Sequence, residues 1–305
     1  MTSGDSTGSI LTVNEILNWT SSVLAAAGIE SPRSDAEIIL CRFLSTDKTS
    51  IYADPSKRLP EEVACRVKEA VKQRSSGVPV QYIVEETQFL DHLIKVKPGV
   101  LIPRPETELL AVEATKALSE ALDKRPPWGP PEPLAADIGT GAGPLAVALA
   151  AAIPRLTVYA TDISPEALEM TRENAETAGV GDRVMTLKGH MVEPLKDRSL
   201  EGRLAAVVCN PPYVSEPQWA ILPDEVKDHE PREALMAGAE GLDRIEELIA
   251  EAPAFLTSRG VLAFEMGAWQ WPKVLRLLDR QTKLGSFRVI RDLAGYERIA
   301  TAIKI

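Results

Sequence analysis

The sequence predicts an α/β protein in which a sheet-forming domain follows a small helical domain and a hairpin. Beyond residue 133, short apolar runs alternate with longer amphipathic stretches, which is typical of a parallel sheet covered by helices on both faces. The first eighty or so residues instead carry apolar side chains at helical spacing. Proline occupies five of the nine positions 125–133, the composition of a semi-rigid linker. We therefore expect domains at 1–84 and 133–305, with a hairpin, a helix and the linker over 85–132.

Three helices are expected in the first domain. One begins at Thr12, where Glu15 completes a capping box, and ends at Gly28. The second opens at Ser31-Pro32, and the third spans about 60–73. The side chains expected to face the bundle core are Ile16, Trp19, Val23 and Ala27, then Ile39, Leu40, Phe43 and Leu44, and finally Val63, Val67 and Val71.

Basic side chains gather in this region of an otherwise acidic chain. Most often such a group is a solvated face, but it also suits an acidic partner. The residues are Lys57, Arg58, Arg66, Lys68, Lys72 and Arg74.

The middle of the chain predicts two short strands at 87–90 and 93–96 around an Asp91-His92 turn. Prolines at 103 and 105 then force extended backbone before a helix that carries Leu109, Val112 and Leu118. In the last domain we expect helices over 144–152 and 164–178. Strands are expected at 134–138, 157–161, 184–188, 204–209, 260–265, 287–291 and 298–303.

Composition excludes several classes of protein. With 305 residues, 45% of them hydrophobic, the chain can bury a substantial core. A formal charge of -10 argues against a protein whose main task is to coat phosphate backbones. No apolar run reaches membrane-spanning length, and the first nine residues resemble a disordered tail more than a signal peptide, so a cytoplasmic protein is expected. Cys41, Cys65 and Cys209 are scattered and the histidines lack ligand spacing, which predicts neither disulfide nor metal.

A glycine-rich loop follows the first strand of the last domain. Gly139, Thr140, Gly141, Ala142 and Gly143 stand where that strand passes into a helix, and glycines there let the backbone approach a ligand closely. Asp162 ends the next strand about 20 residues on, the spacing at which a carboxylate binds ribose hydroxyls. The loop alone also fits a tight turn or a looser dinucleotide pattern, so the nucleotide class stays open.

A second motif follows the apolar strand at 204–209. Asn210 offers an amide, Pro211 and Pro212 stiffen the chain while leaving carbonyls free, and Tyr213 offers a flat ring. An isolated Asn-Pro-Pro is most often only a loop. Combined with the glycine loop and Asp162, it suits methyl transfer to a planar nitrogen, because two acceptors on the N–H bonds turn the delocalised lone pair toward an electrophile.

These motifs and several others resemble the peptide chain release factor glutamine methyltransferases, the PrmC/HemK family of class I methyltransferases. The resemblance runs from about Thr12 to the end of the chain. Its motifs are residues 77–82, 100–108, 210–213, 225–226, 230–235, 241–243, 264–267 and 292–295. It implies a Rossmann-like sheet with a helical substrate-recognition domain, and N5 methylation of the glutamine in the Gly-Gly-Gln loop of class 1 release factors, with no membrane and no direct nucleic-acid contact.

The resemblance also implies S-adenosylmethionine as cofactor and S-adenosylhomocysteine as product. The methionine part would lie on residues 139–143, the ribose on Asp162, and the substrate amide among Asn210, Pro211, Pro212 and Tyr213, with Asn210 also near the cofactor. On the adenine side the family usually shows Gly-Asp and a bulky residue, whereas this chain has Gly189-His190-Met191; His190 would hydrogen bond to adenine and Met191 would pack on its face. The family's glycine at the position of Glu85 is also missing.

Two alternatives remain beside this reading. An exocyclic amine of DNA or RNA presents a similar edge to the same tetrapeptide, though such a substrate needs a basic, aromatic channel that is not evident here. A non-catalytic binding protein would result if His190 prevented cofactor binding. For Glu106 and Glu265 we expect a place near the cofactor's amino group, or a helix cap, rather than a catalytic role.

Overall fold

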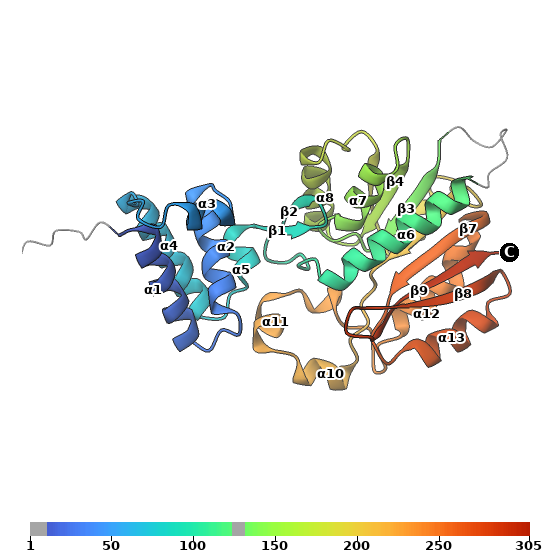
Figure 1. The fold of residues 1–305 in the computed structure, drawn as a ribbon. Helices are drawn as coiled ribbons and strands as arrows, with labels where there is room; N and C mark the ends of the chain where they lie inside the picture. Colours follow the sequence, from blue (N-terminus) through green and yellow to red (C-terminus); the bar gives the residue numbers. More distant parts are fainter. Residues whose placement is uncertain (1–10, 124–131) are drawn as a thin grey trace, which may run out of the picture. The chain divides into compact units, whose positions relative to one another are not determined.

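The computed structural model describes residues 11–123 and 132–305, which form two compact units (Figure 1). One unit contains the residues up to Glu85 together with Asp224–His229, and the other contains Glu86–Pro223 and Glu230–Ile305. The predicted tail and most of the predicted linker lie outside the described residues. The predicted domain boundaries, 1–84, 85–132 and 133–305, stay predictions.

The first unit is helical, as predicted, but has more helices than the sequence suggested. It contains α1 (Val13–Ala26), α2 (Pro32–Leu44), α3 (Lys48–Ala53), α4 (Glu61–Ser75), α5 (Val80–Val84) and α11 (Asp224–His229). The predicted capping box is present, with Glu15 N donating to Thr12 Oγ1 and Thr12 N donating to Glu15 Oε2. α3, α5 and α11 escaped prediction because five or six residues are too few to show a periodicity.

The buried face of α1 differs from the predicted one. Two overlapping apolar stripes run along this helix, and the structure buries Val13, Ile16, Leu17 and Leu24. Trp19 is 39% exposed. The stripe that contains Leu17 and Leu24 packs against the neighbouring helices, whereas the indole of Trp19 stays partly in solvent.

Arg74 does not belong to a solvated basic face. Its guanidinium is buried, where Nε lies 2.6 Å from Asp35 Oδ2 and Nη1 lies 3.0 Å from Glu225 Oε2. Since a buried cation needs paired anions, Arg74 is a structural residue that ties α11 to α2 and α4. Lys57, Arg58, Arg66, Lys68 and Lys72 are exposed.

The second unit begins with the predicted hairpin, formed by β1 (Glu86–Phe89) and β2 (His92–Lys95). α6 (Pro105–Asp123) follows, and it buries Leu110, Ala111, Ala114 and Leu118. Val112, which the sequence placed with Leu118, is 49% exposed.

Seven strands form the main sheet in the order β5-β4-β3-β6-β7-β9-β8. They are β3 (Leu134–Ile138), β4 (Thr157–Asp162), β5 (Val184–Lys188), β6 (Leu204–Cys209), β7 (Leu256–Glu265), β8 (Leu284–Arg291) and β9 (Glu297–Lys304). The first five run parallel, as expected, but β9 is antiparallel to both β7 and β8. The parallel sheet that the alternating pattern predicts is thus found in five strands, and β9 departs from it because a tight turn after β8, closed by Asp292 N and Tyr296 O at 2.8 Å, leaves no room for a crossover.

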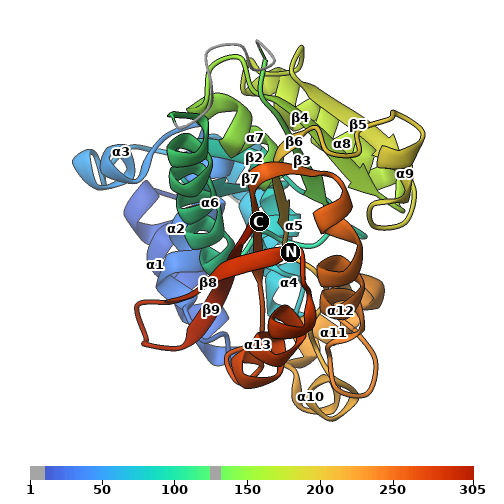
Figure 2. The same ribbon diagram turned by 90° about the vertical axis from the view of Figure 1, so that its right-hand side faces the viewer.

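Helices cover both faces of this sheet (Figure 2). α6, α7 (Pro144–Ala152) and α8 (Pro165–Thr177) pack side by side in one layer, while α12 (Asp243–Glu251) and α13 (Trp271–Arg280) pack together in another. Shorter helices lie in the connections: α9 (Glu193–Lys196), α10 (Glu216–Ile221), η1 (Arg232–Ala234) and η2 (Ala252–Ala254). A search of the described residues finds no helix with the length and apolar character that a membrane span requires.

Candidate functional site

The predicted motifs meet where three neighbouring strands end. β3 lies between β4 and β6, so the loops after these strands open onto one edge of the sheet, at the point where the chain order reverses. A cavity of about 610 Å³ lies there. Of the predicted site residues, it is lined by Gly139, Thr140, Gly141, Ala142, Asp162, His190, Met191, Asn210 and Pro212, whereas Gly143, Pro211 and Tyr213 are not among the residues that line it.

The glycine loop requires glycine for two different reasons. Gly139 and Gly141 have φ values of 68° and 57°, a left-handed backbone that bare glycines adopt readily, and no atom stands within 4 Å of where a Cβ would be. At Gly143 a Cβ would come within 2.8 Å of Thr171 Cγ2. The loop therefore leaves open space on the cavity side and packs tightly against α8 behind it.

Thr140 has a side chain that supports the loop instead of facing a ligand. Its hydroxyl donates to Asp137 Oδ2 at 2.6 Å, and Ala146 N donates to the same oxygen at 3.1 Å. Burial raises the pKa of Asp137 to about 7. The other oxygen, Oδ1, has no hydrogen-bond partner among the described residues. The sequence had not singled out Asp137 as a titrating group.

Asp162 holds the glycine loop as well as facing the cavity. Oδ2 accepts from Gly141 N and Oδ1 from Ser164 N, both at 2.9 Å. Burial raises the pKa of this carboxyl, while hydrogen bonds from the backbone N–H groups of Ser164, Gly141 and Ile163 oppose the shift. Each carboxylate oxygen retains a lone pair, so the side chain can still accept from two neighbouring hydroxyls.

Asn210 is joined to a buried hydrogen-bond relay. Its Nδ2 donates to Thr107 Oγ1 at 3.0 Å, and the Thr107 hydroxyl donates to Glu265 Oε2 at 2.8 Å. Tyr213 OH donates to Glu265 Oε1 at 2.8 Å. Thr107 and Glu265 are 2% and 0% exposed. Glu265 thus stands behind the cavity wall, holding Thr107 and Tyr213.

Thr107 was missed as a single residue, although it lies inside a motif that the family resemblance singled out. Its position in the first turn of α6 carried no chemical signal, because a threonine near a helix start most often serves the helix. Thr107 and Asn210 are 103 residues apart in the sequence, and only the fold brings their side chains together.

The part of the cavity lined by His190 contains a carboxylate from a distant element. His190 Nε2 donates to Glu247 Oε1 at 2.7 Å, and Arg244 Nη1 donates to Glu247 Oε2 at 2.9 Å. Glu247 and Arg244 belong to α12. Met191 follows with φ of 46°, and its carbonyl accepts from Thr161 Oγ1 at 2.9 Å. The family's usual aspartate after β5 is absent, and the carboxylate found in this region is that of Glu247, which pairs with His190.

Two loops forming the cavity wall are joined by one buried carboxylate. Glu230 accepts from Arg104 Nη2 at 2.5 Å and from Ile102 N at 3.3 Å. Residues of both loops line the cavity: Gly99, Val100, Leu101 and Pro103 from one, and Pro231, Glu233 and Ala234 from the other. The ion pair therefore holds these two parts of the cavity wall together.

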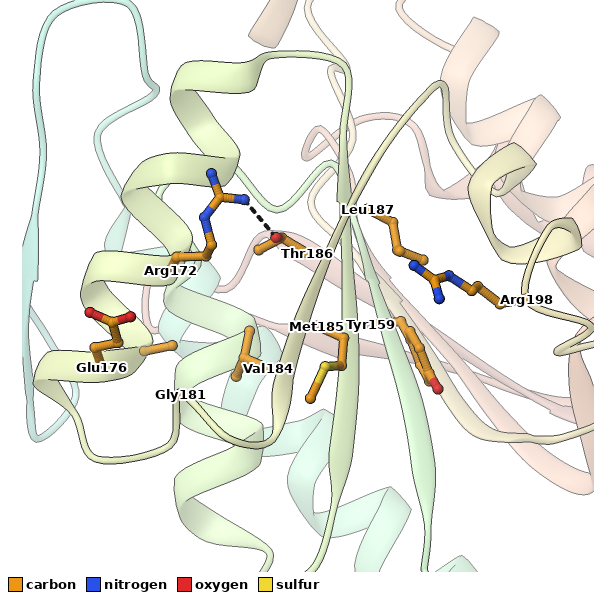
Figure 3. A pocket seen from close by; sticks show the side chains of 10 residues that line it. Tyr159, Arg172, Glu176, Gly181, Val184, Met185, Thr186, Leu187 and Arg198 are labelled. Atoms are coloured by element: carbon orange, nitrogen blue, oxygen red, sulfur yellow. Dashed lines mark hydrogen bonds between the residues drawn. The ribbon is translucent and has the colours of Figure 1, made fainter.

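A second hollow, of about 370 Å³, lies along the edge strand β5. Figure 3 shows the Arg172 side chain of α8 beside Thr186 of β5, where Arg172 Nη1 donates to Thr186 Oγ1 at 2.9 Å. None of the predicted site residues lines it. It is separate from the chemistry at the carboxyl ends of the strands.

Together, the sheet order, the glycine loop and the acid after β4 define a Rossmann-like methyltransferase. Two family models match the chain: the PrmC N-terminal domain over residues 15–84 and the methyltransferase small domain over residues 112–222. A release factor glutamine methyltransferase from Rhodopirellula baltica is 35% identical, covering 96% of each chain. One from Moorella thermoacetica is 37% identical, covering 96% of this chain and 99% of the relative. The chain belongs to the release factor glutamine methyltransferase family.

Among solved structures, the hMettl16 catalytic domain in complex with the MAT2A 3'UTR hairpin 6 superposes with a TM-score of 0.54. It is 16% identical, and the match covers 80% of this chain and 82% of that one. That likeness concerns the fold alone.

Proposed function

We propose that this protein transfers a methyl group from S-adenosylmethionine to the side-chain amide nitrogen of the glutamine in the Gly-Gly-Gln motif of class 1 peptide chain release factors. One observation carries the proposal. The Asn210 side chain lines the cavity beside the glycine loop while its nitrogen is held from behind by Thr107. An amide acceptor fixed beside a nucleotide-binding loop is what methylation of a planar nitrogen requires.

The residues present fit the cofactor. The cavity volume lies within the range of small-molecule sites, and the space above Gly139 and Gly141 is free of side chains. Residues 139–143 would hold the methionine part, Asp162 the ribose hydroxyls, and His190 with Met191 the adenine. When bound, S-adenosylmethionine supplies an electrophilic methyl group and leaves as S-adenosylhomocysteine.

The protein's part in the reaction is to bind and orient the amide. Asn210 Oδ1 and the Pro211 carbonyl would accept its two N–H bonds, which turns the nitrogen lone pair toward the methyl group. As the N–C bond forms, the nitrogen loses one proton to solvent. Glu265 does not line the cavity, so orientation and desolvation carry the step instead of a strong base.

Family membership makes a glutamine amide the leading substrate over an exocyclic amine of nucleic acid. The formal charge of -10 also disfavours a nucleic-acid substrate. A non-catalytic binding protein is disfavoured because His190 is paired with Glu247 at the cavity wall and does not fill the cavity. Since release factors act in translation, we place the protein in the cytoplasm.

The test uses purified protein, cofactor, and either intact release factor or nucleic acid. Mass spectrometry should find one added methyl group on the Gly-Gly-Gln peptide, and none when the substrate glutamine is replaced. Methyl label only in nucleic acid would contradict the proposal. Calorimetry with S-adenosylmethionine separates the non-catalytic alternative, because binding without transfer to any substrate would support it.

A further inference from the structure

Four side chains from three distant segments form one continuous hydrogen-bonded relay behind the substrate site. Asn210 and Tyr213 follow β6, Thr107 lies in α6, and Glu265 ends β7. Glu265 is fully buried, and Thr107 is 2% exposed although it lines the cavity. The partners that these side chains find in the protein therefore decide the direction of their hydrogen bonds.

The direction of the relay is determined by Glu265. Both oxygens of Glu265 accept here, Oε2 from Thr107 Oγ1 and Oε1 from Tyr213 OH, so both hydroxyl protons point at the carboxyl group. Thr107 has a single proton, and once this is committed to Glu265 its oxygen can only accept from Asn210. The group of Asn210 that faces Thr107 must then be the NH₂.

The consequence lies on the opposite side of the carboxamide. With Nδ2 held by Thr107, Oδ1 is the atom that Asn210 has free for a substrate. A reversed carboxamide would set Oδ1 against an oxygen without a proton and would offer a donor to the substrate's own N–H bonds. Because a buried unpaired polar group costs about 1–3 kcal/mol, the relay keeps the reversed state sparsely populated.

We propose that Thr107 is a positioning residue for methyl transfer. Its hydroxyl donates to Glu265 and accepts from Asn210 Nδ2, which leaves Asn210 Oδ1 to face the substrate amide. This inference rests on the proposed function. Thr107 itself does not touch the reacting atoms in this account and acts through Asn210. Burial raises the pKa of Glu265, and the two hydrogen bonds from Tyr213 and Thr107 oppose that shift.

The first test is Thr107→Val, which keeps the shape but removes both hydrogen bonds. We expect kcat for release factor methylation to fall about 30-fold, because the carboxamide loses its preferred orientation. The Kd for S-adenosylmethionine and the KM for release factor should change less than about threefold. Thr107→Ser retains the hydroxyl and should restore kcat to within about threefold of the wild type.

A double-mutant cycle separates this role from a merely structural one. If Thr107 acts through Asn210, Thr107→Val should cause no further loss of single-turnover rate in the Asn210→Ala background. Glu265→Gln keeps the shape of the relay but lets it reverse, so it should lower kcat several-fold alone and not at all beside Thr107→Val. Thr20→Val is a matched control, since Thr20 is a buried threonine whose Oγ1 has no partner among the described residues.

The outcomes distinguish this inference from the proposed function. Failure of the wild-type protein to methylate release factor would overturn the proposed function and the relay with it. Normal wild-type methylation with undiminished kcat in Thr107→Val would overturn the relay alone. So would additive losses with Asn210→Ala. If Thr107→Val lowers the Tm sharply, Glu265→Gln carries the test, and an unchanged kcat there counts against the relay.

Discussion

At the scale of single residues, His190 shows how a distant partner changes the meaning of a substitution. Where the family usually has an aspartate, this chain has a histidine whose Nε2 donates to Glu247. Restoring the aspartate would therefore set two carboxylates against each other. The local chemistry at this part of the cavity depends on the His190–Glu247 pair and not on position 190 alone.

We expect His190→Asp to weaken S-adenosylmethionine binding about tenfold, even though it restores the usual family residue, because two carboxylates in contact would repel each other and displace the side chain expected to contact adenine. Calorimetry measures the Kd. His190→Asp with Glu247→Gln should recover most of the affinity, whereas His190→Asp with Glu246→Gln should not, since Glu246 is exposed on the same helix. Equal affinities of the single variant and the wild type would contradict this account.

Asp137 gives a prediction about pH. Burial raises its pKa from 3.8 to about 7, so the unfolded state loses this proton first as pH rises. The contribution of Asp137 to the free energy of unfolding is fully present below pH 3.8 and is lost as pH rises through about 7. The loss is on the order of 4 kcal/mol.

Asp137→Asn should therefore raise the Tm relative to the wild type at pH 8 but not at pH 4. Its amide oxygen can replace Oδ2 as acceptor for Thr140 and Ala146. Thermal unfolding followed by circular dichroism at both values measures the difference. A Tm difference independent of pH would show that Asp137 does not titrate in this range.

At the scale of elements, the sequence predicts best where one local signal decides. β3, β5, β6 and α7 were predicted with their observed bounds, because buried apolar runs end at glycines, prolines or charged residues. The direction of β9 depends on the short turn before it, and the buried face of α1 on its neighbours. The same division holds in the site: strand ends located the glycine loop, Asp162 and Asn210, whereas Thr107 and Glu247 reach them only through tertiary packing.

The end of α5 provides a prediction at this scale. Glu85 has φ of 63°, a left-handed conformation that costs a non-glycine residue about 1 kcal/mol, and it stands where the family has glycine. Glu85→Gly should raise the free energy of unfolding by about 0.5–1 kcal/mol in urea denaturation. Glu69→Gly, at an exposed helical position in α4, should lower it by about 1 kcal/mol. A loss of stability in both variants would show that Glu85 has contacts worth more than the backbone strain.

At the scale of the whole molecule, the two units are joined by more than one passage of the chain. The chain leaves the helical unit after Glu85, returns for Asp224–His229, and leaves again. The returning segment carries Glu225, which pairs with the buried Arg74, and it is followed at once by Glu230, which pairs with Arg104. The helical unit is therefore continuous along the chain with Pro231, Glu233 and Ala234, which line the cavity.

The last prediction concerns that recognition. Lys68 and Lys72 are exposed and one turn apart on α4, so they present two positive charges on one face. If the helical unit binds acidic groups of the release factor, Lys68→Glu with Lys72→Glu should raise the KM for intact release factor roughly tenfold at low salt. Each single reversal should raise it about threefold, and the effect should shrink in 0.5 M salt, which screens exposed charges to within about 5 Å.

Lys116→Glu, an exposed reversal on α6, is the matched control and should leave the KM unchanged. A short Gly-Gly-Gln peptide lacks the remote surface, so its methylation rate should be the same for all variants. Equal losses with the peptide and with intact release factor would place these lysines outside substrate recognition.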